Sequence, residues 1–458
     1  MSVPTVTSIN SGDFLGKWTA ELESDFSKDD QPAVFLPGHP KEWGQETARI
    51  NLPIPADSAR LTHIALNDDG HYLAVSADSD VRIYDTSSLE VVRTLPGIHP
   101  RSVSSIRFQP GQNLDGKLLV SGTSSRGDRH GFDQVNVVRC WDLGEPAEMA
   151  ITPDTLAEAA QAATSAAVGV LAAGRNPFSN DDVSKIQNQI LDTLSWTQVK
   201  LGLQSGHACE GRLTKGRVFS SDGSLFLYAN QHNAVVISDS QTLQERYTLV
   251  GHTGLVTWAE TTPDDSIVGT SSWDRTVRLW NTSTGEQLRV LTGVAAQIWI
   301  GAFSPDGSVL CAGIGDGQIR VWSVGNGELL HTLGGFDRWV RSIAFSPDGK
   351  HVAAGSRRGT LRIFEVSTWE SAQLWRVEQG PGASFLEVNA FYTSRGLLVF
   401  RCGGRVFTYD LETNQKGYYK HAAGITQSSA SGQTVATSDG QTLINVDFDR
   451  NVRLWRLA

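Results

Sequence analysis

Aspartate residues recur at one fixed distance before aromatic residues, and carboxylates are among the groups that catalysis or metal binding would use. Each of these aspartates lies six residues before a tryptophan or a tyrosine. The pairs are Asp78 with Tyr84, Asp274 with Trp280, Asp316 with Trp322, and Asp449 with Trp455. A histidine, His252, also precedes the second pair. These residue types could supply acid–base or metal-binding chemistry, so their spacing has to be explained first.

Sequence motifs of catalysis are absent. We find no nucleophile elbow, no phosphate-binding glycine loop, and no His/carboxylate pattern at the spacing of metal ligands. Asp447 and Asp449 bring two carboxylates together, but Asp449 already belongs to the repeated pattern. The four cysteines are far apart and form no CxxC pair, so neither a disulfide framework nor a zinc site is indicated. We expect no cofactor and no metal.

Eight short strand-like segments share one pattern, and five of the seven steps between them are 42 to 46 residues long. They are VRIYD (81–85), VRCWD (138–142), VVISD (235–239), VRLWN (277–281), IRVWS (319–323), LRIFE (361–365), VFTYD (406–410) and VRLWR (452–456). The fourth residues of the central copies are 42 residues apart. This period predicts an all-β chain in which a four-stranded unit is repeated as the blades of a β-propeller. We expect eight blades, with seven as the alternative because the copy at 383–420 is weak.

The copy at 251–291 resembles the tryptophan-aspartate (WD) repeat along nearly its whole length. Gly251 and His252 open it, the turn TPDD (262–265) follows, and Asp274 and Trp280 have the expected spacing. The resemblance implies blades of four strands, a to d, that run outward from a central channel. It also implies a buried hydrogen-bonded chain of His252, Thr270 or Ser272, Asp274 and Trp280. Because a buried carboxylate is costly unless its lone pairs are satisfied, we expect these residues to be structural.

The other copies carry the WD pattern in part. The resemblance extends the structural role to Asp78, Asp316, Trp322, Asp449 and Trp455. Three copies depart from the pattern, because Arg358, His232 and Gly403 stand where the aspartate is expected. We expect those blades to hold the turn between strands b and c by other contacts.

The two ends of the chain each carry part of a repeat, which predicts how the propeller closes. The C-terminal copy supplies strands a, b and c, and the segment AVFLPGH (33–39) is similar to the end of a strand d. We therefore predict a propeller over residues 31–458, closed by an N-terminal strand near 33–37. Residues 1–30 would form a tail, either partly ordered on the side of the propeller or folded as a short amphipathic helix that binds a partner.

One step between repeats is 97 residues long, from Trp141 to Ser238, and predicts an insertion at 145–198 in the second blade, between strands c and d. Thr152 and Pro153 favour a helix start, and an apolar stripe follows Asn180 at helical spacing. We predict two helices that pack as a hairpin over 152–196. Their apolar faces either cover each other and the blade edge, or they form an arm for docking or oligomerisation.

A set of tryptophan and arginine residues is the candidate binding surface. The resemblance implies that partners bind the face that carries the b–c turns and the first residues of strand a. The residues at those positions in adjacent blades are Trp273, Trp299, Arg338, Trp339, Arg341, Arg357 and Arg358. Trp and Arg are enriched at binding hot spots, and together they suit an acidic or phosphorylated peptide with an apolar anchor. The alternative is that these residues only cap the channel and pair with neighbouring carboxylates.

Composition limits the classes of partner and the cellular location that we expect. The net charge of −10 argues against non-specific binding to nucleic acid, and no apolar run is long enough to cross a membrane. The sequence lacks a secretory leader and a disulfide framework, so we expect an intracellular protein, cytoplasmic or nuclear. The predicted function is a non-catalytic scaffold for protein–protein interaction. The alternatives are an enzyme of hydrolase-like or isomerase-like chemistry at the channel mouth, or a propeller that binds a small ligand.

Overall fold

The computed structural model describes residues 22–42, 45–52, 63–77, 80–95, 102–128, 131–144, 206–377, 387–402, 405–420, 433–446 and 451–457. The chain forms two compact units, residues 1–52 with 214–458 and residues 53–213, and each is described by itself. Every secondary-structure element in the described part is a β-strand. The predicted all-β class is confirmed.

Each blade is a short antiparallel sheet whose strands pair in chain order. The most regular blade consists of β18 (Val256–Thr261), β19 (Ile267–Ser272), β20 (Val277–Asn281) and β21 (Gln287–Leu291). β20 buries side chains on both faces because the blade lies between two others, which explains its branched and aromatic residues. The turns need residues at positive φ, such as Asp265 at 56° and Gly307 at 73°. This requirement explains the repeated Asp and Gly of the turn sequences.

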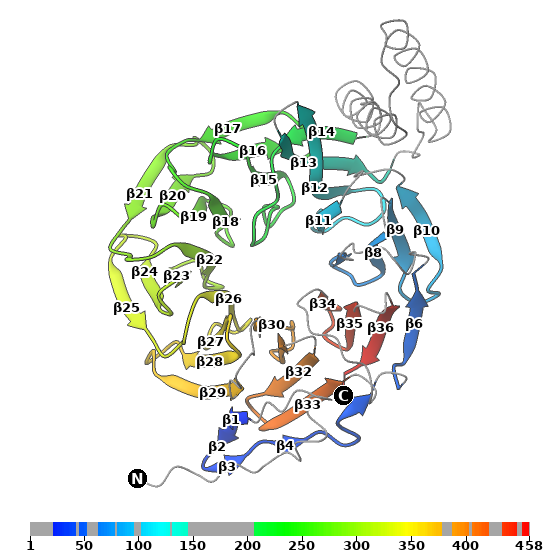
Figure 1. Cartoon of the computed structure of the whole chain (residues 1–458), viewed down its shortest axis with the longest axis vertical. Coiled ribbons are helices and arrows are strands. Elements are labelled where there is room, and N and C mark those ends of the chain that lie inside the picture. Colours follow the sequence, from blue (N-terminus) through cyan, green and yellow to red (C-terminus); the bar gives the residue numbers. More distant parts are fainter. Residues whose placement is uncertain are drawn as a thin grey trace, which may run out of the picture. The chain divides into compact units, whose positions relative to one another are not determined.

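The unit formed by residues 1–52 and 214–458 holds six blades, including β18–β21 (Figure 1). The others are β15 (Leu225–Ala229) to β17 (Glu245–Leu249) with β16 (Val235–Asp239); β22 (Ile298–Phe303), β23 (Val309–Ile314), β24 (Ile319–Ser323) and β25 (Leu329–Leu333); β26 (Val340–Phe345), β27 (His351–Ser356), β28 (Thr360–Glu365) and β29 (Ser371–Val377); β30 (Asn389–Tyr392), β31 (Leu398–Cys402), β32 (Arg405–Asp410) and β33 (Gln415–Lys420); and β34 (Thr434–Ala436), β35 (Thr442–Val446) and β36 (Asn451–Arg456). The first strands β18, β22, β26 and β30 contact one another in chain order. Residues of neighbouring blades can therefore meet at the ends of these strands.

The unit formed by residues 53–213 holds two blades. They are β7 (Ile64–Leu66), β8 (Tyr72–Ala77), β9 (Asp80–Asp85) and β10 (Val91–Leu95), and β11 (Ser102–Phe108), β12 (Lys117–Asp128), β13 (Gly131–Asp142) and β14 (Gly206–Glu210). The two units together contain eight blades, so the eight-blade prediction is confirmed over the seven-blade alternative. β12 and β13 are 12 residues long each and form one long hairpin, in which Asp128 lies opposite Gly131.

The N-terminal strand that completes the last blade is not the predicted one. β6 (Ala48–Asn51) pairs antiparallel with β36, with Val452 opposite Ile50, and supplies the missing outer strand. The segment near 33–37 instead contains β4 (Val34–Phe35), which adds to β33 in parallel. The Gly-His after residue 37 resembled a blade opening, but a strand d must lie close ahead of the next strand a, and among the described N-terminal strands β6 lies nearest to β7 in the sequence.

Within the predicted tail at 1–30, residues 22–30 contain short strands along the side of a blade and not the alternative amphipathic helix. β1 (Leu22–Ser24) pairs with β29 as a fifth strand of that blade, and β2 (Ser27–Lys28) pairs with β3 (Gln31–Pro32). The physical reason is Phe26, whose buried ring lies flat against Tyr409 at 3.9 Å between ring centroids. Residues 1–21 lie outside the described part.

The insertion falls between the last residue of β13, Asp142, and the first residue of β14, Gly206, which are strands c and d of the second blade. Residues 145–198, with the helices predicted at 152–196, lie outside the described residues, so the helical hairpin and its docking or oligomerisation role stay predictions. Gly206 and His207 do not open a blade, because they pair with Trp141 and Cys140 inside the sheet.

Close approach of a glycine backbone to a tryptophan fixes the contact between two neighbouring blades. Trp258 on β18 is fully buried, and a Cβ atom added at Gly301 on β22 would lie 2.6 Å from its ring atom Cε3. That distance is shorter than any real contact between carbon atoms. Only glycine at position 301 lets β22 pack this closely on β18.

We predict that Gly301→Ala lowers the free energy of unfolding by about 1–3 kcal/mol, because the added methyl group overpacks the blade interface. Chemical denaturation followed by tryptophan fluorescence measures the change. Gly334→Ala is the matched control, because a Cβ atom at Gly334 would meet nothing within 4 Å. Equal stability of the two variants would contradict the proposed packing constraint.

Candidate functional site

A buried chain of hydrogen bonds holds the turn between β19 and β20. Trp280 Nε1 donates to Thr270 Oγ1 at 2.9 Å, and Thr270 Oγ1 lies 2.8 Å from His252 Nε2. His252 Nδ1 lies 2.8 Å from Asp274 Oδ2. Ser272 does not belong to this chain but accepts from the Asp274 N–H at 3.0 Å and donates to the Gly254 carbonyl. The structure therefore gives Thr270 and Ser272 separate positions in one network.

Neutral His252 with its proton on Nδ1 satisfies every bond of this chain. In that form Trp280 donates to Thr270, Thr270 donates to Nε2 of His252, and His252 donates to Asp274. Burial lowers the pKa of His252, and this effect is larger than the opposing effect of Asp274, so burial favours the neutral form. For Asp274, burial opposes ionisation, but hydrogen bonds from Thr276 and His252 outweigh it and lower the pKa. All the groups of this network are used in holding the turn.

The equivalent positions in other blades are held in different ways. Asp316 accepts from the Gln318 N–H at 3.0 Å, and the strand-c residues Trp322 and Trp455 are buried. Where Arg358 replaces the turn aspartate, Asp337 supplies a carboxylate from the loop before β26, and Thr360 donates to it at 3.3 Å. Asp78 and Asp449 lie outside the described residues. The carboxylate that holds this turn can thus come from the b–c turn itself or from the loop before strand a.

Three tryptophans from three consecutive blades form a continuous stack, and we call the predicted set Trp273, Trp299, Arg338, Trp339, Arg341, Arg357 and Arg358 the Trp–Arg patch. Trp273, in the turn before β20, meets Trp299 on β22 edge to face, with ring centroids 5.0 Å apart. Trp299 stacks on Trp339, directly before β26, at 4.8 Å and an interplanar angle of 20°. Trp273 is 38% exposed, so the stack reaches the surface.

Two arginines cover the ring faces of this stack. The guanidinium carbon of Arg341 lies 4.4 Å from the Trp299 ring centroid, and that of Arg357 lies 4.7 Å from the Trp339 centroid. Such cation–π contacts hold a guanidinium in place while its N–H groups can still bind an anion. Arg338 and Arg358 occupy exposed positions next to Trp339 and Arg357. All seven predicted residues therefore lie along the ends of adjacent blades, and five of them are in direct ring contact.

Two charged residues of the site were missed in the sequence. Glu387 forms an ion pair with Arg341, with Oε1 3.5 Å from Nε, and Lys215 Nζ donates to the Arg341 carbonyl at 3.1 Å. Burial, and to a smaller extent the charge of Arg341, lower the pKa of Lys215 to about 8, against the opposing effect of Glu387. Neither residue belongs to a repeated motif, so no sequence signal pointed to them.

Trp299 leaves one polar group unused. Its Nε1 is buried and has no hydrogen-bond partner in the structure. A Cβ atom added at Gly315 would lie 3.4 Å from this nitrogen, so glycine leaves space beside it. The patch thus offers indole surface and guanidinium groups to a ligand, while the Trp299 N–H stays buried. These groups suit a ligand that combines an apolar part with a negative charge.

Within the residues that the structure covers, no group of three or more His, Cys, Asp or Glu side chains is arranged to hold a metal ion. In the same part of the chain, no helix has the length and apolar character that crossing a membrane requires.

Comparisons with known proteins agree with the repeat pattern. The family model described as "WD domain, G-beta repeat" matches residues 53–85, 243–281, 285–323 and 327–365. The chain is also similar to a protein described as "Transcriptional corepressor LEUNIG_HOMOLOG" from Arabidopsis thaliana, with 35% identity over 81 residues. That match covers 18% of this chain and 10% of the relative.

We predict that Thr270→Val lowers the free energy of unfolding by about 2–4 kcal/mol, because it leaves Trp280 Nε1 and His252 Nε2 buried without partners. Denaturant titration measures the loss. Thr282→Val is the matched control, since the Thr282 hydroxyl is buried and already has no hydrogen-bond partner. A loss in the control as large as in Thr270→Val would show that the network contributes nothing specific.

We also predict that the wild-type chain gains stability as pH rises from about 8 to 10.5, relative to Lys215→Met. Folded Lys215 releases its proton near pH 8, whereas the unfolded chain keeps it until about 10.5, so the unfolded state binds more protons in this window. The difference in slope cannot exceed about 1.4 kcal/mol per pH unit, because Lys215 binds at most one proton more in the unfolded state than in the folded state. Urea unfolding at several pH values measures it, and parallel curves would refute the shifted pKa.

Proposed function

Because this chain belongs to the WD-repeat β-propeller family, we propose that it is a non-catalytic scaffold that binds a protein partner at the Trp–Arg patch. The single observation that carries the proposal is the stack of Trp273, Trp299 and Trp339, which spans three blades and reaches the surface. A core-packing role alone would not require a 38% exposed tryptophan at the end of the stack. Hot spots of protein interfaces have this composition.

The chemistry of the patch favours an acidic or phosphorylated peptide with an apolar anchor. Arg341 and Arg357 are held on ring faces, and Arg338 and Arg358 add charge at exposed positions. A carboxylate or phosphate could accept from several of these N–H groups at once. An apolar side chain of the partner would cover the exposed part of Trp273.

The proposed location is inside the cell, in the nucleus or the cytoplasm. The nuclear alternative is supported by the relative, whose description is that of a transcriptional corepressor. The matched segment spans a tenth of that relative's length, so partners of the relative are not transferred to this chain.

We predict that Trp273→Ala, Trp339→Ala and Arg341→Ala each reduce recovery of the bound partner at least tenfold, because each removes part of the contact surface or its charge. Affinity purification followed by quantitative mass spectrometry measures recovery, and phosphatase treatment of the lysate tests whether phosphate is required. Arg246→Ala is the control, since Arg246 is an exposed arginine paired with Asp239 away from the patch. Unchanged recovery with all three variants would rule out this surface.

A further inference from the structure

Residues 22–36, which we call the docked segment, bind along the outer edges of two neighbouring blades. β1 pairs antiparallel with β29, with Leu22 opposite Val377. β4 pairs in parallel with β33, where the Val34 N–H donates to the Asn414 carbonyl at 3.1 Å. Peptides that add a strand to an exposed sheet edge bind in this way. The segment therefore contacts its blades as a bound peptide would.

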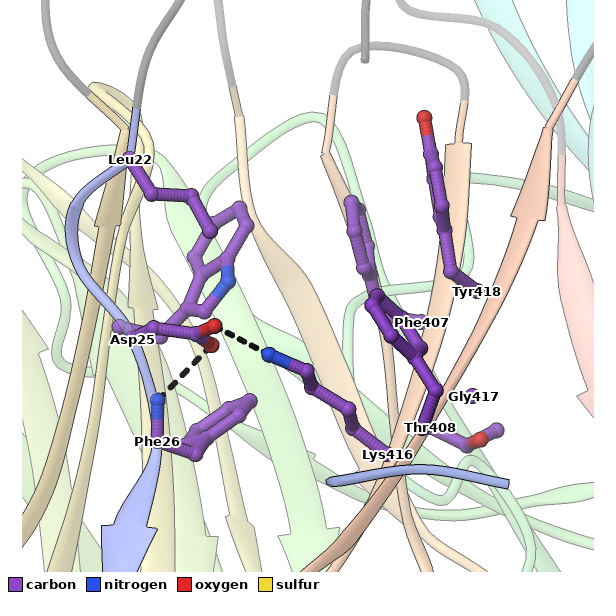
Figure 2. A pocket seen from close by; sticks show the side chains of 10 residues that line it. Leu22, Asp25, Phe26, Phe407, Thr408, Lys416, Gly417 and Tyr418 are labelled. Atoms are coloured by element: carbon purple, nitrogen blue, oxygen red, sulfur yellow. Dashed lines mark hydrogen bonds and ion pairs between the residues drawn. The ribbon is translucent and has the colours of Figure 1, made fainter. Parts of the chain in front are cut away.

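An acidic–aromatic pair anchors the docked segment. Phe26 is 2% exposed and stacks on Tyr409, while its other neighbour Phe400 meets it edge to face at 5.8 Å. Asp25 forms an ion pair with Lys416 and accepts from the Phe26 N–H at 2.8 Å (Figure 2). The blades thus provide an aromatic wall and a cation for the two residues of this pair.

A second ion pair also joins an acidic residue of the docked segment to a basic residue of a blade. Glu23 Oε1 lies 3.2 Å from Arg376 Nη1 on β29. The blade edges therefore contribute Arg376 and Lys416, and the segment contributes Glu23 and Asp25. The site recognises alternate acidic residues ahead of an aromatic one.

The docked segment is attached to the blades through short strands and few buried side chains. Its strands are two or three residues long, and of its fifteen side chains only Phe26 and Ala33 are buried. The residues from Ser27 to Pro32 are all exposed. Segments with few buried contacts open at a small fraction of the global free energy of unfolding.

The docked segment also leaves its site incompletely filled. A pocket remains between Leu22, Asp25 and Phe26 of the segment and Phe407, Thr408 and Tyr418 of the blade (Figure 2). Thr408 lines this pocket, is fully buried, and its Oγ1 has no hydrogen-bond partner. An unpaired buried hydroxyl is costly, so a ligand that paired with it would bind better than the present occupant.

We propose that the outer edges of β29 and β33 form a second binding site, separate from the Trp–Arg patch, for an extended acidic–aromatic segment of a partner protein. The docked segment occupies this site in cis and is displaced by the partner. Occupation in cis lowers the apparent affinity for any external segment by the fraction of time that the site is open. Loosening the cis contact must therefore strengthen binding in trans.

The test uses the full chain and a fluorescent synthetic peptide with the sequence of residues 22–36. Phe26→Ala removes the cis anchor, so we expect this chain to bind the peptide with a Kd at least tenfold lower than wild type, measured by fluorescence anisotropy. A peptide with Glu23→Lys and Asp25→Lys should bind at least tenfold more weakly. Asp25→Lys in the chain is a second way to open the site, should Phe26→Ala unfold.

Controls separate this site from the Trp–Arg patch. Adding Lys416→Glu to the Phe26→Ala chain should abolish peptide binding, whereas adding Trp339→Ala should leave it unchanged. No binding by a folded Phe26→Ala chain, or equal binding of the charge-reversed peptide, overturns the proposal. A wild-type dimer that forms with concentration and is dissociated by the peptide would identify a second copy of this chain as the occupant and overturn the choice of a separate partner.

Discussion

Asp274 accepts hydrogen bonds from His252 and from the backbone N–H groups of Thr253 and Thr276, and this buried carboxylate holds the turn that carries Trp273. A blade is only one sheet thick, so its turns cannot be fixed by a core of their own and depend on polar groups that satisfy one another. The stack of three tryptophans follows from this constraint, because Trp273 meets Trp299 only if the turn is rigid. In the next blade but one, Asp337 provides the carboxylate from the opposite loop, so the usual aspartate position is open to Arg358. Where the structural carboxylate comes from the other loop, the turn position can therefore carry a residue that serves binding.

The repeated strand pattern was sufficient to predict the fold class and the number of blades, because each copy has to bury the same faces against its neighbours. The closing strand was not predicted, since residues 48–51 resemble no other strand d and a Gly-His dipeptide near residue 39 resembled a blade opening. The distance to the next strand a was the signal that could have found β6. Glu387 and Lys215 reach Arg341 from other parts of the chain, and such contacts leave no local pattern. The rings of the patch could be placed from the repeat, but their mutual stacking could not.

The arrangement of the patch distinguishes between ligands of opposite charge. Aromatic cages that bind cations present open ring faces, but here Arg341 and Arg357 already lie on the faces of Trp299 and Trp339. A cationic ligand would have to displace a guanidinium and would meet the remaining arginines. An anionic ligand would instead find guanidinium groups that are already ordered, so less side-chain entropy is lost on binding. The ring contacts therefore favour anion recognition for the same reason that they disfavour a cation cage.

The outermost strands of the blades differ in whether a further strand pairs with them. β21 and β25 end their sheets and expose Leu288, Val290, Leu329 and Leu330. β29 and β33 are instead covered by the docked segment, although it buries only two side chains. The apolar strands β21 and β25 need protection from aggregation at least as much as β29 and β33 do, and yet they remain uncovered. Edge protection alone therefore does not explain why the cover lies on β29 and β33. What sets these two edges apart is Arg376 on β29, Lys416 on β33 and the adjoining Tyr409 on β32. They recognise two acidic residues and an aromatic one, and this specificity is the property of a binding site.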